Sequence, residues 1–267
     1  ASAANQQTII TSLGNTETKL ESIKTAVELI DNSIYVDDAD WSATSSSHNL
    51  IGGVYQLSPR MADRFAATAM MAGHPNETSP LGLRNIGFTI HMGVKDSAYD
   101  RNKVAIEWRD KLQSLRENDP AGYEHWVEIY KDKGHWVDRL DSSAIGWITQ
   151  FNRNPFPKKV VWKQDDVTHN RFYWLRVNDP VERSLIVANI SGQTINIENS
   201  TLSEIIIMLN DDIIDMDKMI IVKYMGDEIF NSIVHRNVNT IEKSIKEYGD
   251  PKSVYFGEIF ISLDKLK

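Results

Sequence analysis

The segment Phe88-Thr89-Ile90-His91-Met92-Gly93-Val94-Lys95-Asp96 decides the fold class, because a strand-like apolar run ends directly before an acidic turn. A helical pattern follows over residues 102–115, and a second strand-like run covers residues 126–130. Gly134-His135-Trp136 comes shortly after that second run. Strands that alternate with helices predict a parallel sheet covered by helices. The acid and the histidine both follow strand ends, where an open α/β sheet places its functional groups.

Asp96 and His135 are the candidate catalytic residues. In a Ser-His-Asp triad a carboxylate orients the imidazole and stabilises its cation, while the imidazole takes the proton of the serine. Taken alone, an Asp in a turn usually only hydrogen-bonds its own backbone, and a His in a loop usually occupies a surface position. Their shared order and spacing are what predict an acid and base pair. Gly134, directly before His135, predicts a sharp backbone bend that only glycine makes easily.

The nucleophile is unknown. It should precede Asp96 on a Gly-x-Ser-x-Gly turn between a strand and a helix, and the sequence contains no such turn. Ser45, Ser46 and Ser47 lie in a Ser- and Thr-rich stretch that indicates a linker. A triad serine must instead be held rigidly beside the base and the oxyanion donors.

Composition narrows the possible partners. The formal net charge of −8, without a basic block, argues against nucleic acid as a partner. No run approaches the roughly 18 apolar residues of a membrane span, so we expect no membrane partner. The chain has no cysteine, which excludes disulfides and thiolate chemistry. Its first residues lack the features of a signal peptide, and the localisation stays unknown.

Neither a metal nor a cofactor is expected. The spacing of His48, His74 and His91 matches no metal-ligand pattern, and His91 falls within a strand where core packing is favoured. The acidic residues at 211, 212, 215 and 217 lack the spacing of a calcium-binding loop and are typical of a solvated turn.

An apolar stripe occupies the N-terminal part, residues 1–49. Its residues recur at spacings of three, four and seven: Ile9, Leu13, Leu20, Ile23, Val27, Ile30 and Ile34. A lone helix of this length is marginal in water, so its apolar face needs a partner. Two alternatives stay open, namely packing on its own domain and self-association into a homo-oligomer through residues 9–34.

Two further parts follow, residues 50–157 and residues 158–267. In the former, Ser58 and Pro59 predict a helix start and residues 66–72 a buried strand. Residues 140–151 predict an amphipathic helix. In the latter, short β-type runs separated by turn residues predict a β-sandwich. These runs cover residues 160–162, 171–177, 184–189, 194–198, 204–209 and 219–224, then a helix at 240–248 and a last strand at 254–262.

Residues 53–263 resemble bacterial α/β-hydrolases of the esterase or peptidase type. The segments that carry the resemblance include Gly53-Val54-Tyr55-Gln56-Leu57-Ser58-Pro59-Arg60-Met61-Ala62-Asp63-Arg64-Phe65 and Ala69-Met70-Met71-Ala72-Gly73-His74-Pro75-Asn76. The resemblance implies Asp96 as the triad acid, His135 as the triad base, and a β-rich tail domain. It places the nucleophile at position 48, where this chain has His48 in place of serine. The family's earlier strands and oxyanion loop should precede Gly53, and the residues there are too few to hold them, so we expect a partial sheet.

A shorter resemblance, to a segment of bacteriophage virion proteins, covers the N-terminal part. It rests on residues 18–27, on Tyr35-Val36-Asp37-Asp38-Ala39-Asp40-Trp41 and on residues 52–56. Two functions therefore stay open. The first is a serine hydrolase relative that acts on a small ester or peptide, weakly or not at all because its nucleophile is missing. The second is a non-catalytic, virion-associated module that associates through residues 9–34.

Overall fold

The computed structural model describes residues 53–263, except for the side chain of Tyr248, and these residues belong to one compact unit. The predicted stripe of residues 9–34 and the linker after it lie outside the described residues. The described chain combines helices with sheets, which confirms the mixed α and β class. Among these residues, no helix has both the length and the hydrophobicity that crossing a bilayer requires.

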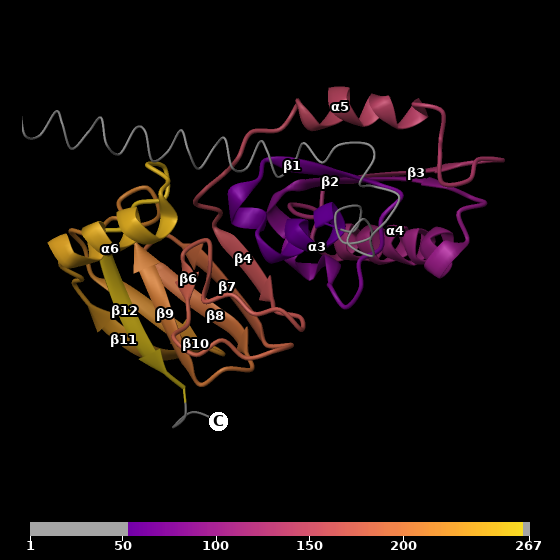
Figure 1. Cartoon of the computed structure of the whole chain (residues 1–267). Coiled ribbons are helices and arrows are strands. Elements are labelled where there is room, and N and C mark those ends of the chain that lie inside the picture. The colour runs from indigo at the N-terminus through magenta and orange to yellow at the C-terminus, as the bar shows by residue number, and fades with distance from the viewer. Residues whose placement is uncertain (1–52, 264–267) are drawn as a thin grey trace, which may run out of the picture. The chain divides into compact units, whose positions relative to one another are not determined.

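The first half of the described chain is built on a three-stranded parallel sheet. Its strands are β1 (Ala67–Met71), β2 (Gly87–Gly93) and β3 (His125–Tyr130), in the order β1-β2-β3. Its helices are α3 (Gly53–Arg60), α4 (Arg101–Asn118) and α5 (Ser143–Ile148). α5 lies against one face of the sheet, and α3 and α4 lie against the other (Figure 1). The predicted parallel sheet with covering helices is therefore present.

The central strand β2 is buried along its whole length. Because side chains alternate between the faces of a strand, its even and odd positions meet different helices. The ring of Phe88 packs against Tyr55 of α3 and Trp108 of α4. The ring of His91, on the other face, packs edge-on against Trp126, which in turn contacts Trp147 of α5. The face toward α3 and α4 is apolar, and the other face carries Thr89 and His91, whose buried polar atoms are hydrogen-bonded.

Helix α4 buries one stripe and exposes the rest. Ala105, Trp108 and Leu112 are buried at helical spacings of three and four. The helix ends where the backbone N–H of Asp119 bonds to the carbonyl of Leu115. The prediction of a helix over residues 102–115 is thus confirmed, with one further turn at its C-terminal end.

The predicted helix start at Ser58 is wrong. Helix α3 already includes Gly53, and Ser58 is buried in its last turn, where its hydroxyl donates to the carbonyl of Val54 at 2.5 Å. Pro59 follows in the same turn, and because it has no N–H it cannot donate to the carbonyl of Tyr55 four residues earlier. Of the predicted helix over residues 140–151, the structure forms a short 3₁₀ turn and then α5. The 3₁₀ helices of this half are Ala62–Arg64, Pro80–Asn85, Ala98–Asp100 and Leu140–Ser142.

The second half holds two sheets and one helix. Its elements are β4 (Lys159–Lys163), β5 (Arg171–Phe172), β6 (Leu175–Arg176), β7 (Leu185–Ser191), β8 (Thr194–Ser200), β9 (Glu204–Leu209), β10 (Ile220–Tyr224), β11 (Asp227–Ser232), α6 (Val238–Tyr248) and β12 (Gly257–Ser262). The five-stranded sheet has the order β11-β10-β8-β7-β4, and the four-stranded sheet has the order β12-β9-β6-β5. All strand pairs in both sheets are antiparallel except β8 with β10.

Two predictions for this half fail. The predicted strand over residues 171–177 is a hairpin, β5 and β6, whose turn at Tyr173 and Trp174 is buried in the core. Tyr173 adopts a left-handed φ of 52°, and the indole of Trp174 donates to the carbonyl of Pro157 at 2.8 Å. Buried aromatic residues thus replace the polar residues by which turns are usually recognised. Strand β11 was not predicted, because its exposed, polar positions lack an apolar pattern.

Polar contacts join the two halves. Arg84 and Asn85, at the end of the 3₁₀ helix Pro80–Asn85, both donate to the carbonyl of Lys159 at the start of β4. Arg84 also pairs with Asp119 at 2.8 Å, and this hydrogen bond holds the pKa of Asp119 below its usual range. The buried apolar residues of the two halves belong to one continuous cluster.

Candidate active site

The structure brings Asp96 and His135 together. Asp96 lies in the loop after β2, and His135 lies in the loop after the neighbouring strand β3. Nδ1 of His135 lies 2.9 Å from Oδ2 of Asp96, within hydrogen-bond distance. Because β2 and β3 run parallel, their carboxyl ends lie at the same edge of the sheet.

A backbone contact between the two loops sets this distance. The N–H of Lys95 donates to the carbonyl of Lys133 at 2.8 Å, and the N–H of Val94 donates to the carbonyl of Tyr130 at 3.0 Å. A Cβ atom on Gly93 would lie only 2.0 Å from the carbonyl oxygen of Gly134. A residue without a side chain is therefore required at position 93 for the loops to meet.

The reason given for Gly134 is wrong. Its backbone is not among those with a left-handed φ, and a Cβ atom there would meet nothing within 4 Å. The conformational freedom of glycine is thus not needed directly before His135. The steric requirement falls on Gly93, across the loop contact, and sequence alone gave no sign of it.

Asp96 is held by a second partner. Its side chain is 3% exposed, and its Oδ1 accepts hydrogen bonds from Nε of Arg101 at 3.2 Å and from the guanidinium NH2 group at 2.8 Å. The Arg101 side chain is itself only 11% exposed. The two carboxylate oxygens are thus divided between Arg101 and His135, which fixes the rotation of the carboxyl group.

Sequence reasoning missed Arg101. It stands at the first residue of α4, five positions after Asp96, where a charged residue is usually taken as part of a solvated helix surface. The position of Arg101 depends on a left-handed turn at Tyr99 and Asp100, both with φ of 55°, which the sequence does not reveal. The guanidinium of Arg101 also lies 5.8 Å from the centre of the Tyr99 ring.

His135 is positioned on one side and open on the other. Its side chain is 36% exposed, and within residues 53–263 no other group forms a hydrogen bond with its ring. Since Nδ1 faces a carboxylate, the neutral tautomer that fits this contact has its hydrogen on Nδ1 and a lone pair on Nε2. Trp136, next in the chain, is 85% exposed and meets the imidazole edge-on at 6.2 Å. This arrangement can accept a proton from a group that approaches Nε2.

Two other histidines singled out by sequence, His91 and His74, are not part of this site. His91 is buried, between the Thr89 hydroxyl and the Tyr130 hydroxyl, as core packing predicts. His74 lies on an exposed turn, where Nδ1 contacts Asn76. Ser45, Ser46, Ser47 and His48 lie outside the described residues.

The acidic loop of the second half is already paired. Asp211 and Asp217 both bind Arg236, and Asp215 binds Lys218. In the described part of the chain, no three His, Asp or Glu side chains are grouped as a metal ion would need.

Comparison with models of protein families, with curated proteins and with solved structures finds no match for this chain. The site must therefore be interpreted from its own geometry.

Proposed function

We propose that this chain is a serine hydrolase relative of the esterase or peptidase type that keeps the triad acid and base. In this proposal residues 53–157 correspond to the C-terminal half of an α/β-hydrolase-like domain, and residues 158–263 to a β-sandwich-like domain. Because the nucleophile turn is missing from the sequence, hydrolysis is weak or absent. The observation that supports the proposal best is the hydrogen bond of 2.9 Å between Asp96 and His135.

The position of this pair strengthens the proposal. An acid after one strand and a base after its parallel neighbour give the imidazole a fixed direction at the edge of the sheet. Asp96 would hold the Nδ1 hydrogen and stabilise the imidazolium that forms when Nε2 takes a proton. Arg101 would keep the Asp96 carboxyl group aligned, because it binds the oxygen that His135 leaves free.

The missing serine limits what the pair can do. A triad without its nucleophile keeps only the residual acceleration that binding and the oxyanion donors supply. An exposed imidazole can still attack an activated ester directly, with its own nitrogen as the nucleophile. The substrate class that fits is therefore a small ester with a good leaving group, turned over slowly.

Two assays on the full chain test the proposal. The first measures hydrolysis of p-nitrophenyl acetate by the natural protein, by His135→Gln and by His235→Gln, since His235 is exposed and far from the pair in sequence. We expect slow turnover that His135→Gln abolishes and His235→Gln leaves unchanged. The second treats the same three proteins with a fluorophosphonate probe, and we expect no labelled serine.

The outcomes separate the parts of the proposal. Turnover that survives in His135→Gln would exclude a role for the pair. A serine that is labelled in the natural protein and not in His135→Gln would show that a nucleophile is present after all, and the chain would then be a complete hydrolase.

A further inference from the structure

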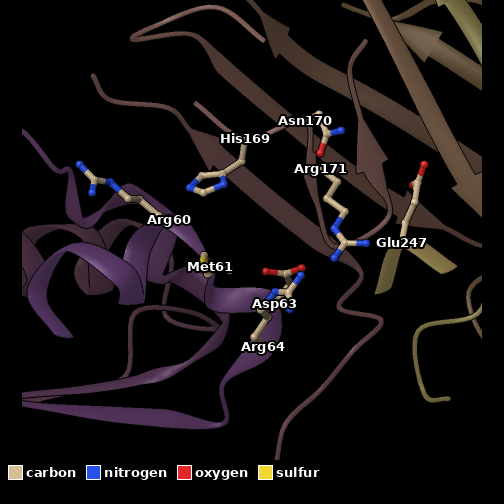
Figure 2. Close-up of a pocket in the computed structure, with 8 residues that line it drawn as sticks. All are labelled: Arg60, Met61, Asp63, Arg64, His169, Asn170, Arg171 and Glu247. Atoms are coloured by element: carbon tan, nitrogen blue, oxygen red, sulfur yellow. The ribbon is translucent and has the colours of Figure 1, made fainter. Parts of the chain in front are cut away.

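A polar pocket of about 320 Å³ lies between the 3₁₀ helix Ala62–Arg64, hairpin β5–β6 and helix α6. Asp63 and Arg64 line one side, and His169 and Arg171 line the other, with the Arg171 side chain reaching toward Asp63 and Arg64 (Figure 2). Glu247 of α6 completes the wall. The volume is at the lower end of the range for small-molecule sites.

This pocket is separate from the candidate active site. Asp63 and Arg64 come just before β1, at its amino end, whereas Asp96 and His135 follow the carboxyl ends of β2 and β3. The three strands are parallel, so the pocket and the pair lie at opposite ends of the sheet. A five-residue strand spans about 16 Å, which excludes contact of one small ligand with both.

Two side chains at or beside the pocket, His169 and Arg176, hold buried nitrogen atoms without a hydrogen-bond partner among the described residues. Burial and the nearby Arg60 lower the pKa of His169, which favours its neutral ring. Nε2 of His169 is buried and has no hydrogen-bond partner among the described residues. The same holds for Nε and one terminal nitrogen of Arg176. This residue lies opposite Arg171 in the register of strands β5 and β6. Arg176 approaches Glu247 only at 3.6 Å, and its side chain is 12% exposed. Buried donors of this kind normally find an acceptor.

Not every arginine of the pocket is available. Arg60 already pairs with Asp165 at 2.8 Å and with Asp166 at 3.0 Å. Arg64, in contrast, is exposed, and no ion pair or hydrogen bond of its side chain is formed with the described residues. In Figure 2 the side chains of Arg64 and Arg171 reach toward the same part of the pocket, and the His169 ring lies on the side of Arg60.

We propose that this pocket binds an oxyanion group, phosphate or carboxylate, of a small molecule, with Arg64 and His169 as its ligands and with Arg171 adding positive charge to the lining. Guanidinium groups match the geometry of such groups by donating two parallel hydrogen bonds. Arg176 does not line the pocket, but it approaches the lining residue Glu247 at 3.6 Å and adds positive charge nearby. The volume of about 320 Å³ leaves room for a molecule larger than a single ion.

The acidic residue Asp63 affects how tightly this pocket would bind an oxyanion. Burial raises the pKa of Asp63. The neighbouring Arg64, Arg171 and Arg153 lower it by a smaller amount, so the net effect disfavours the charged carboxylate. An arriving oxyanion competes with the Asp63 carboxylate for the same cations. Removal of that carboxylate should therefore strengthen binding, whereas removal of Arg64 should weaken it.

Calorimetric titration of the full chain tests the proposal at constant ionic strength. The probes are inorganic phosphate and phenyl phosphate in one arm, succinate in a second, and glycerol as a neutral control. The variants are Arg64→Gln, His169→Gln and Asp63→Asn, with Arg109→Gln as a matched surface control, since Arg109 pairs only with its neighbour Asp110.

We expect saturable binding of phenyl phosphate or succinate, and the arm that binds more tightly identifies the oxyanion. Arg64→Gln should weaken this binding about tenfold, the typical loss for one hydrogen bond to a charged group. Asp63→Asn should tighten it severalfold, and Arg109→Gln should not change it. Absence of saturation in both arms, or equal losses in Arg64→Gln and Arg109→Gln, would overturn the proposal. Neither outcome depends on ester hydrolysis, so this site and the Asp96–His135 pair succeed or fail independently.

Discussion

The carboxylate of Asp96 links two side chains, with Arg101 on one oxygen and His135 on the other. Each contact restricts the orientation of the neighbouring side chain. Asp96 is almost fully buried and accepts hydrogen bonds on both oxygens. Without a counter-ion its charge would be costly to bury, and Arg101 removes that cost. The carboxylate is therefore structural as well as chemically useful, and its two roles can be separated by substitution.

The structural role predicts that Asp96→Asn destabilises the protein strongly. The change leaves the buried guanidinium of Arg101 without a counter-ion, which typically costs about 3–5 kcal/mol. Urea denaturation measures the loss. Asp132→Asn is the matched control, because Asp132 is 87% exposed and pairs only with the exposed Lys95. Equal stability of the two variants would show that Arg101 does not depend on Asp96.

A buried histidine predicts that stability falls in mild acid. Burial lowers the pKa of His91, so the unfolded chain takes up a proton before the folded chain does. The stability that neutral His91 provides is complete above its ordinary pKa of about 6.5 and is lost as the pH falls below it. One such group changes the free energy of unfolding by at most about 1.4 kcal/mol per pH unit.

Urea denaturation between pH 7 and pH 5 checks this effect in the natural protein, in His91→Gln and in His235→Gln. We expect His91→Gln to have a smaller loss of stability on acidification, because glutamine cannot be charged. His235→Gln, at an exposed position, should follow the natural protein. Parallel curves for all three proteins would exclude His91 as the source.

Among the elements, the loops after β2 and β3 show where sequence reasoning succeeds and where it fails. The order of strand, acid, helix, strand and histidine was enough to predict that the two loops lie at one edge of the sheet, because parallel strands end together. The closeness of the loops depends on Gly93 and on the carbonyl of Gly134, a contact between residues 41 positions apart. A single sequence carries no information about such a contact.

The same limit explains the other errors. Helix α4 was predicted correctly, because the spacing of its apolar residues is local information. The hairpin β5–β6 was missed because its turn is fixed by the burial of Trp174 against Pro157, which is a tertiary effect. Arg101 was missed because its partner is decided by a left-handed turn and not by helix periodicity.

The loop contact predicts opposite outcomes for two neighbouring glycine substitutions. Gly93→Ala should force the loops apart, because its Cβ would overlap the carbonyl oxygen of Gly134, and overpacking of this kind costs about 1–3 kcal/mol. Gly134→Ala meets nothing within 4 Å and should change stability by less than about 0.5 kcal/mol.

Thermal unfolding followed by circular dichroism measures both variants. The reactivity of His135 toward diethyl pyrocarbonate provides a second readout, since separation of the loops removes its bond to Asp96. We expect this reactivity to change in Gly93→Ala and to stay constant in Gly134→Ala. A stable Gly93→Ala protein with unchanged reactivity would contradict the predicted steric role.

At the scale of the whole molecule, the two halves should unfold together. Arg84 and Asn85 tie the first half to β4, Arg60 pairs with Asp165, and one apolar cluster runs through both halves. A shared core of this kind favours a single cooperative transition. We therefore expect tryptophan fluorescence and far-ultraviolet circular dichroism to give the same midpoint in urea.

The substitution Arg60→Gln provides a sharper version of this test. It removes the pairs with Asp165 and Asp166, so it should lower the common midpoint without splitting the transition. Two separate transitions in the natural protein would mean that residues 53–157 and residues 158–263 are independent folding units.

If Asp96 and His135 are a catalytic pair, as we propose, the burial of Asp96 beside Arg101 affects which of the two residues can be lost in evolution. A lineage that stops using its catalytic machinery can discard a surface imidazole at little cost, whereas loss of the carboxylate would endanger the fold itself. Asp96 would therefore be retained for the stability of the fold even after catalysis is lost. Among descendants, the identity of position 135 should report on recent use far better than position 96.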